Sequence, residues 1–293
     1  MPAHGSAPVR AVVTSRKRLP EDAWGAVRGD DGTLAVWVVD GATPLDARDP
    51  VTANAQVAHF AWALSRFLQF GLTKALRQEP SSGGLTGEEL SAVVEEARRR
   101  AQLGFGARFG RAACPTATLS LVVRAGQDLL AWRIGDSPLW IETDDGIVTV
   151  TDPQYEGGEE RVLQRWRELR AGGLSAGAAY REVLDGQAAS RRRRNTPEGL
   201  WILGGDERAA AHGRLRRLRE PAPARVAVLS DGLERCVSPF HLVTREQLFD
   251  SLHAGTALDS VRRLRHAEAA DPARTRVPRL TAHDDITGVA AVL

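Results

Sequence analysis

The sequence predicts an α+β fold in which antiparallel strands pack beneath helices. Short apolar runs rich in β-branched residues occupy both ends and the centre of the chain, and turn signals such as Asp-Gly separate them. Two long segments with apolar residues at helical spacing lie between the first and second groups of runs. A hydrophobic content of 43% in 293 residues is enough for a large core and excludes a mainly disordered chain.

The N-terminal part predicts three strands and then two long helices. The strands are expected at residues 9–13, 23–27 and 33–39. Asp30, Asp31 and Gly32 predict a hairpin turn between the second and third of them. The helices are expected at residues 51–77 and 85–105, and Thr86 is the predicted N-cap of the second.

The central part predicts four more strands, at residues 116–123, 128–134, 138–141 and 147–150, which we expect to form one antiparallel meander. Residues 152–198 are polar, with helices expected at 161–170 and 178–184. Because this stretch lacks the apolar density for a core of its own, we interpret it as a helical insertion or flap in a single domain of residues 1–293. Strands at 199–203, 226–229 and 285–293 and helical structure at 245–269 complete the prediction.

Charge and cysteine content exclude several classes of protein. The 39 basic and 37 acidic residues nearly cancel, so no global attraction to nucleic acid or membrane is expected. Only Lys17 and Lys74 are lysines, which we interpret as the bias of a GC-rich bacterial genome. Cys114 and Cys236 lie outside any CxxC motif, which argues against a thiolate zinc site or disulfides. With no signal-peptide pattern and no long apolar run, a cytoplasmic location is expected.

Four aspartates lie where an apolar strand begins or ends: Asp40, Asp136, Asp231 and Asp284. Each one alone is explained by turn chemistry, because Asp-Gly commonly follows a strand. Four carboxylates gathered at one rim would repel one another unless cations neutralised them. Carboxylate and carbonyl oxygens are the ligands that Mg²⁺ and Mn²⁺ prefer. Their joint occurrence therefore favours a divalent metal site.

Six motifs resemble, in order, those of the metal-dependent protein phosphatase family (PPM, or type 2C), in its bacterial form. They are Lys17-Arg18-Leu19-Pro20-Glu21-Asp22, Val38-Val39-Asp40-Gly41, Pro115-Thr116-Ala117-Thr118, Ile134-Gly135-Asp136-Ser137, Leu229-Ser230-Asp231-Gly232 and Asp284-Asp285-Ile286-Thr287. Any one of them is weak, but six in family order across nearly the whole chain are a strong signal. The resemblance implies a central antiparallel β-sandwich with helices on both outer faces.

The resemblance also implies a site with two Mg²⁺ or Mn²⁺ ions, or three. Asp40 would bridge two metals, with Asp231 and Asp284 on the first. Glu21 and the Gly41 carbonyl would serve the second, and Asp136 matches a position that binds a third, weaker metal. Asp22 would support the ligands or a bound water, and we expect Asp40, Asp231 and Asp22 to be the catalytic residues.

The chain departs from the family pattern at three places. The arginine that binds substrate phosphate is replaced by Lys17, which lacks the bidentate fork, and its neighbours Arg16 and Arg18 are further candidates for this role. Ala42 and Thr43 stand where many members have a histidine proposed as general acid, and His283 is a candidate replacement. Asp285 replaces the usual asparagine.

The arginine run at residues 191–194 has two interpretations. It could dock phosphorylated or acidic substrates. A solvated flexible segment is favoured, because charge runs commonly have that role.

The predicted function is hydrolysis of phosphoserine and phosphothreonine in proteins by a water that two metal ions activate. No Ser-His-Asp or catalytic cysteine motif is recognised, in agreement with a mechanism without a covalent intermediate. Two alternatives stay open: a pseudophosphatase that serves as a regulatory binding module, and a phosphatase of a small metabolite. The oligomeric state is not predicted.

Overall fold

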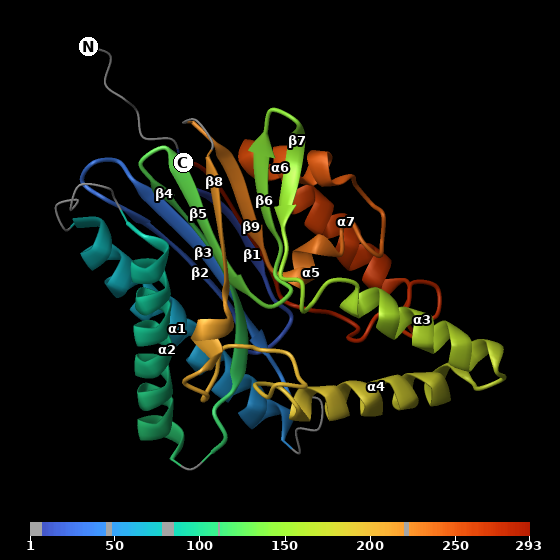
Figure 1. Ribbon diagram of the computed structural model, residues 1–293. Helices are drawn as coiled ribbons and strands as arrows, with labels where there is room; N and C mark the ends of the chain where they lie inside the picture. The colour runs from blue at the N-terminus through green and yellow to red at the C-terminus, as the bar shows by residue number, and fades with distance from the viewer. Residues whose placement is uncertain (1–7, 45–48, 78–84, 111, 220–222) are drawn as a thin grey trace.

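Two five-stranded antiparallel sheets pack face to face in the computed structural model (Figure 1). The model describes residues 8–44, 49–77, 85–110, 112–219 and 223–293. The first sheet has the strand order β1-β10-β9-β6-β7 and the second the order β2-β3-β4-β5-β8. The strands are β1 (Arg10–Thr14), β2 (Asp22–Arg28), β3 (Leu34–Ala42), β4 (Thr116–Ala125), β5 (Asp128–Ile134), β6 (Leu139–Thr143), β7 (Gly146–Val150), β8 (Arg214–Arg219), β9 (Arg225–Leu229) and β10 (Ile286–Val292).

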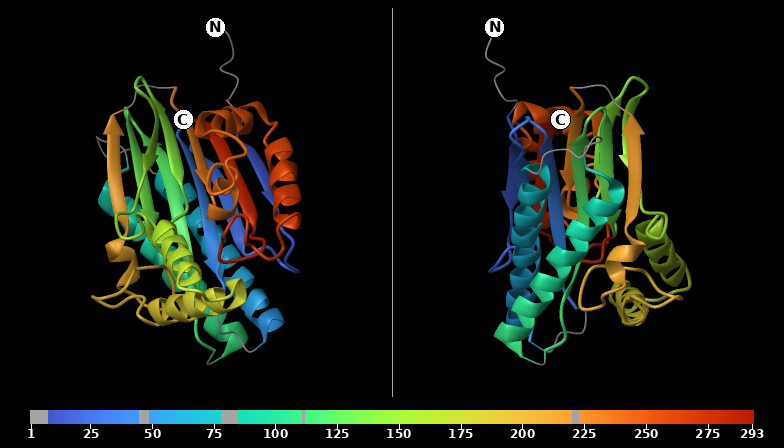
Figure 2. Two further views of the ribbon diagram at one scale, coloured as in Figure 1. Left: turned by 90° about the vertical axis from the view of Figure 1, so that its right-hand side faces the viewer. Right: turned by 60° about the vertical axis from the view of Figure 1, so that its left-hand side comes forward.

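Helices cover both outer faces of this sandwich (Figure 2). They are α1 (Pro50–Arg77), α2 (Gly87–Phe109), α3 (Gly158–Ala171), α4 (Ala176–Arg192), α5 (Asp231–Glu234), α6 (Arg245–Ala254) and α7 (Leu258–Ala269). Helices α1 and α2 lie on the β2–β5 sheet, and α5 and α6 contact β10 of the other sheet. Among the described helices, none combines the length and apolarity needed to cross a bilayer. The predicted α+β sandwich with helices on both faces is confirmed.

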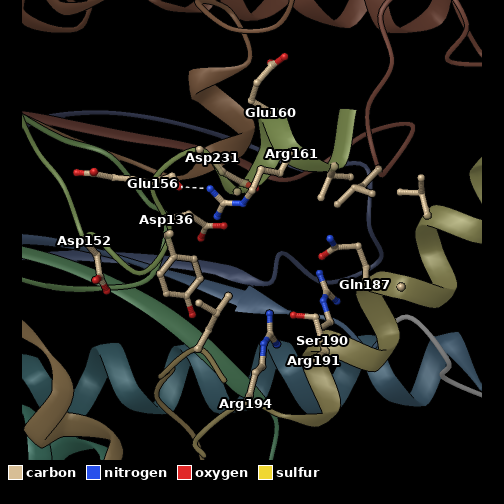
Figure 3. Close-up of a pocket in the computed structure, with 18 of the residues that line it drawn as sticks. Asp136, Asp152, Glu156, Glu160, Arg161, Gln187, Ser190, Arg191, Arg194 and Asp231 are labelled. Carbon is tan, nitrogen blue, oxygen red and sulfur yellow. Dashed lines mark hydrogen bonds between the residues drawn. The ribbon is translucent and has the colours of Figure 1, made fainter. Parts of the chain in front are cut away.

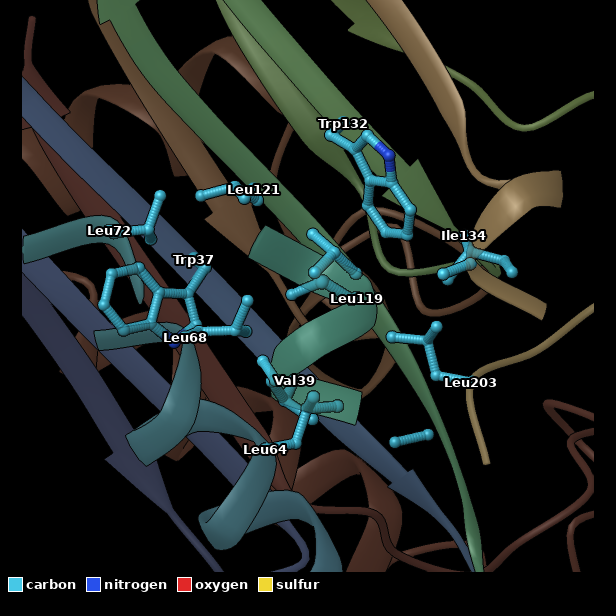
Figure 4. Packing of buried hydrophobic residues seen from close by; sticks show 14 of the residues in the cluster. Trp37, Val39, Leu64, Leu68, Leu72, Leu119, Leu121, Trp132, Ile134 and Leu203 are labelled. Carbon is cyan, nitrogen blue, oxygen red and sulfur yellow. The ribbon is translucent and has the colours of Figure 1, made fainter. Parts of the chain in front are cut away.

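Alternation along β3 divides the hydrophobic core into layers. Val36 and Val38 face the other sheet and pack with residues such as Val228 and Val289. Trp37 and Val39 face the opposite way and pack against α1 and α2 (Figure 4). A third apolar layer joins the other sheet to α6 and α7. The strand ends are therefore held from both sides, which makes them rigid supports for side chains at the rim.

Local signals explain where the helices begin and end. Thr86 caps α2, as the sequence predicted: its hydroxyl accepts a hydrogen bond from the Glu89 backbone N–H, and the Glu89 carboxylate accepts one from the Thr86 backbone N–H. The helical pattern expected over residues 245–269 is divided into α6 and α7 by Gly255, which has φ +78°. Glycine adopts this left-handed conformation without steric penalty.

The expected meander over residues 116–150 is wrong, because the chain changes sheets after β5. Strand β5 pairs with β4, whereas β6 pairs with β9 and β7 in the other sheet. The crossing point is Gly135, which has φ +105° and where a Cβ would lie 2.4 Å from the side chain of Thr118. Glycine alone fits this position, and the residue that follows it is Asp136.

Two further sequence expectations are corrected. Residues 199–203 do not form a strand, and only Leu203 makes an isolated bridge, to Ala117. Strand β8 was not predicted, because four of its six residues are arginines and only Leu218 is buried. This strand forms on the edge of the sheet beside β5, where arginine side chains can extend into water.

Helices α3 and α4 pack against each other at one end of the sandwich (Figure 1). They enclose a small apolar group of Trp166, Ala179, Tyr180 and Val183. The hydroxyl of Tyr180 donates to the Arg274 carbonyl at 2.7 Å. The segment thus has a small core that the sequence analysis did not expect, and it is anchored to the chain that precedes β10.

A methyl group added at Gly25 should destabilise the fold. The new Cβ would lie 2.2 Å from the ring of the fully buried Trp37, so Gly25→Ala should lower the free energy of unfolding by about 1–3 kcal/mol. Gly104→Ala is the control, because this helical glycine has nothing within 4 Å and should gain roughly 0.5–1 kcal/mol. Urea unfolding of both variants checks the two signs, and equal effects would contradict the packing argument.

Candidate functional site

Acidic side chains from several strand ends meet at one end of the sandwich. Asp22 and Asp40 are directly opposite each other in the β2–β3 ladder. Asp231 follows β9, and Asp284 precedes β10, which pairs with β9. Asp40 lies within electrostatic reach of Asp22, Asp231, Asp284 and Asp136. We call these five aspartates, together with the adjacent Glu21 and Asp285, the acidic cluster.

Desolvation and mutual repulsion change the acidity of this cluster. Removal from water, followed by the charges of Asp22 and Asp231, raises the pKa of Asp40 well above its ordinary range. The same two causes raise the pKa of Asp231, with Asp284 as its strongest repelling neighbour. Burial and the charge of Asp285 raise the pKa of Asp22 to about 7. The cluster therefore favours protons or other cations over free negative charge.

Two glycines allow the strand ends to approach this closely. A Cβ on Gly41 would lie 2.5 Å from the Val57 side chain and 2.8 Å from the Glu21 carbonyl oxygen. A Cβ on Gly232 would lie 1.9 Å from the carbonyl oxygen of Asp285. Neither position has room for a side chain, so Gly after Asp is a packing requirement here, in a strand for Gly41 and in a helix for Gly232.

Glu21 is held in place from several directions. Its backbone N–H donates to Asp285 Oδ2 at 2.6 Å. Its Oε1 accepts from Asn54 Nδ2 of α1 at 2.9 Å, and its Oε2 accepts from the Thr43 hydroxyl. Asn54 was not singled out from the sequence, because no motif connects α1 with Glu21, and Thr43 was noted only for standing where many family members have a histidine.

Two cationic side chains contact one side of the cluster. Lys17 Nζ lies 2.8 Å from Glu21 Oε2 and 3.2 Å from Asp284 Oδ1. Burial alone would lower the pKa of Lys17, but the carboxylates of Asp284, Glu21 and Asp285 raise it. Arg235 Nη2 lies 3.1 Å from Asp284 Oδ2. Burial would raise the pKa of Asp284, but Arg235 and Lys17 lower it.

The other predicted phosphate-binding residues point elsewhere. Arg16 and Arg18 are both exposed. The distance between Arg16 Nη1 and His283 Nε2 is 3.2 Å. His283 Nδ1 is 3.0 Å from Glu268 Oε2. Arg16, Arg18 and His283 are not among the described residues that line the cleft beside the cluster. The structure thus brings the predicted acidic residues together but not these basic candidates.

The cleft has a volume of about 1240 Å³, with Asp136, Asp231 and Asp284 on one wall. Helices α3 and α4 form the facing wall, and Figure 3 shows Arg161, Arg191 and Arg194 around the same hollow as Asp136 and Asp231. Tyr155 and Asp152 also line it and had no sequence signal.

The interpretation of residues 191–194 as a solvated segment is half wrong. Arg192 and Arg193 are exposed, whereas Arg191 and Arg194 are half-buried and line the cleft. Arg191 Nη1 donates to the Thr43 carbonyl, and Arg194 Nη1 donates to Thr116 Oγ1 at 3.0 Å. A spacing of three residues near the end of a helix places the two on one side, which is the signal that sequence analysis could have used.

The donor set fits divalent cations that prefer oxygen. Within the described ranges, no three His, Cys, Asp or Glu side chains converge tightly enough to hold one ion. The buried atoms Asp22 Oδ2 and Asp285 Oδ1 have no hydrogen-bond partner among the described residues. Unpartnered carboxylate oxygens beside desolvated aspartates suit Mg²⁺ or Mn²⁺ rather than a soft metal. The ligand roles of individual residues stay predictions.

Comparison with known proteins gives one family. The model of the family described as Protein phosphatase 2C matches residues 14–271. No curated protein matches the chain significantly.

Solved structures share the fold over nearly the whole chain. The catalytic domain of the serine/threonine phosphatase PstP in complex with two manganese ions is 18% identical, with a TM-score of 0.53 over 98% of this chain and 97% of that one. Mycobacterium tuberculosis PstP/Ppp is 18% identical, with a TM-score of 0.56 over 98% and 97%. The S. agalactiae serine/threonine phosphatase is 13% identical, with a TM-score of 0.54 over 98% and 100%. At these identities the likeness shows the fold.

The raised pKa of Asp22 predicts how stability depends on pH without metal. The pKa is about 7 in the folded protein, and the ordinary value of an aspartate in the unfolded chain is about 4. Between these values the folded state holds an additional proton, so stability from this group is present at low pH and lost as pH rises to 7. In EDTA, the unfolding free energy of Asp22→Asn relative to wild type should therefore increase from pH 4 to 8. A difference that is constant across this range would contradict the shift.

Proposed function

Because the chain belongs to the protein phosphatase 2C family, we propose that it removes phosphate from phosphoserine and phosphothreonine in proteins, with two divalent cations in the acidic cluster. The chain is a phosphatase and therefore a hydrolase. The observation that carries the proposal is that the charges of Asp231 and Asp284 act on the buried Asp40 at one end of the sandwich, beside a cleft with arginines on its other wall. The named structural neighbours are serine/threonine phosphatases, and one of them contains two manganese ions.

Each proposed metal ion would have its own set of acidic ligands from the cluster. Asp40 would bridge two ions, Asp231 and Asp284 would hold the first, and Glu21 with the Gly41 carbonyl would hold the second. Asp136 is the candidate ligand of a third. When bound, such ions lower the pKa of a shared water and offset charge on phosphoryl oxygens.

Asp22 supplies a proton-binding group next to this site. Without metal, burial and the charge of Asp285 raise its pKa to about 7, and its Oδ2 has no hydrogen-bond partner among the described residues. A group with a pKa near the working pH can both accept and release a proton. Asp22 would support the metal ligands or a bound water, since it lies opposite Asp40 in the β2–β3 ladder.

The dimensions of the cleft favour a protein substrate. A volume of about 1240 Å³ exceeds the roughly 300–1,000 Å³ of most small-molecule sites. Two helices that connect β7 to the distant β8 form one wall, so an extended chain segment can lie between this wall and the sandwich. Arginines on that wall suit a phosphorylated residue.

Removal of one proposed metal ligand should abolish activity. Asp40→Asn and Asp231→Asn should each lower the Mn²⁺-dependent hydrolysis of p-nitrophenyl phosphate at least about 100-fold, because a weakened ligand set binds the metal less tightly. Asp144→Asn, in the exposed turn between β6 and β7, is the matched control and should keep wild-type activity. In calorimetric titration, Asp40→Asn and Asp231→Asn should bind Mn²⁺ more weakly than wild type, and Asp144→Asn should bind it as tightly as wild type. A wild type that binds no Mn²⁺ would instead favour the pseudophosphatase, in which Lys17 and Arg235 are the resident cations.

Comparison of substrates tests the protein specificity. The kcat/KM for a phosphoserine or phosphothreonine peptide should exceed that for glucose 6-phosphate and AMP by at least about tenfold, because only the peptide contacts the length of the cleft. Hydrolysis of p-nitrophenyl phosphate in the same preparation controls for active enzyme. Equal or better turnover of the sugar or nucleotide phosphate would favour a metabolite phosphatase.

A further inference from the structure

The last turn of α4 brings a guanidinium to the acidic cluster from the opposite wall of the cleft. Arg191 is half-buried, and its Nη1 donates to the carbonyl of Thr43, three residues beyond Asp40. Its charge acts on Asp136, Asp231, Asp284 and Asp40. The proposed metal site and Arg191 therefore lie on two sides of one space (Figure 3).

Arg194 fixes the position of this helix end. Its Nη1 donates to the hydroxyl of Thr116, the first residue of β4. Thr116 is paired with Ala42, the last residue of β3, so both arginine contacts end close to Asp40 and Gly41 at the end of this strand. The end of α4 is thus held against the sandwich at two points, which pre-organises the Arg191 side chain.

The residue expected to bind phosphate is already engaged by carboxylates. Lys17 Nζ contacts Glu21, Asp284 and Asp285 at 2.8, 3.2 and 3.7 Å. Lys17 is not among the described residues that line the cleft. An ammonium held by three carboxylates serves as their counter-ion, and it is not presented to a ligand in the cleft.

With cations bound in the acidic cluster, Arg191 would favour an anion in the cleft. Desolvation lowers the pKa of Arg191, and the charges of the four aspartates act in the opposite direction. The guanidinium remains charged in either case, because arginine is not deprotonated in proteins. Cations bound by the aspartates would offset the attraction between these carboxylates and Arg191, which leaves its guanidinium available to an anion in the cleft. A phosphoryl group has the charge, and its oxygens match the planar fork of a guanidinium.

We propose that Arg191 is the phosphate-binding residue of this chain: its guanidinium binds phosphoryl oxygens of the substrate, and Arg194 positions it. The inference rests on the proposed function, since it names the residue that receives the substrate's phosphoryl group. A solely structural role, in which Arg191 only fastens α4 to Thr43, is the alternative that the experiment must separate.

The experiment compares Arg191→Gln with Arg193→Gln, a matched control two residues along the same run whose side chain is exposed. Inorganic phosphate is the probe, and its affinity is measured by calorimetry in Mn²⁺ and by competitive inhibition of p-nitrophenyl phosphate hydrolysis. Arg191→Gln should weaken phosphate binding about 10- to 100-fold and raise KM similarly, as loss of charge-assisted hydrogen bonds predicts. Arg193→Gln should remain within about twofold of wild type, since surface changes have small effects. Arg191→Lys, which keeps the charge without the fork, should lie between them.

Affinity for Mn²⁺ separates binding from structure. Loss of a neighbouring positive charge cannot weaken cation binding, so Mn²⁺ should bind Arg191→Gln at least as tightly as wild type. The inference is overturned if wild type binds no phosphate, if Arg191→Gln behaves like Arg193→Gln, or if Mn²⁺ affinity falls in parallel with phosphate affinity. If Arg191→Gln does not fold, Arg191→Lys decides by the same criteria. Absence of turnover in a wild type whose phosphate binding depends on Arg191 would reject the proposed function and leave the inference standing.

Discussion

Repulsion among desolvated carboxylates is the constraint on which the rest of this molecule depends. Desolvation raises the pKa of both Asp40 and Asp231, and so do nearby carboxylates: Asp22 and Asp231 act on Asp40, and Asp284 acts on Asp231. The fold must hold these groups together against that repulsion. Lys17 and Arg235 neutralise the side of the cluster near Asp284. The remaining charge is what a divalent cation would neutralise, so the same energy that strains the metal-free protein would drive metal binding.

The sandwich resists this repulsion because its strand ends have little freedom. Val36 and Val38 pack between the sheets while Trp37 and Val39 pack beneath α1 and α2, so the end of β3 is held from two sides. The β2–β3 ladder then places Asp22 opposite Asp40. Tight packing transmits force with little displacement, which allows carboxylates to remain close without relaxing apart.

The α3–α4 wall of the cleft carries both acidic side chains and arginines, and its arginines connect the metal chemistry with the substrate. One wall carries the aspartates, and the α3–α4 wall carries Arg161, Arg191 and Arg194. A phosphorylated residue between them would meet cations on both sides. The small core of α3 and α4 and the contact of Tyr180 with the Arg274 carbonyl give the arginine wall a defined position. Recognition and chemistry would then act on the same phosphoryl group.

Local features of the chain could be predicted from the sequence, whereas pairings across the fold could not. Acidic residues at strand ends, the hairpin at Asp30–Gly32 and the Thr86 cap depend on a few neighbouring residues, so sequence alone determined them. The change of sheet at Gly135, the edge strand β8 and the contacts of Lys17 and Arg191 depend on segments distant in the sequence. The sequence of an arginine-rich run is the same whether its side chains extend into water or into a cleft, because tertiary packing determines their surroundings. Only the folded structure could decide which arginine reaches the site.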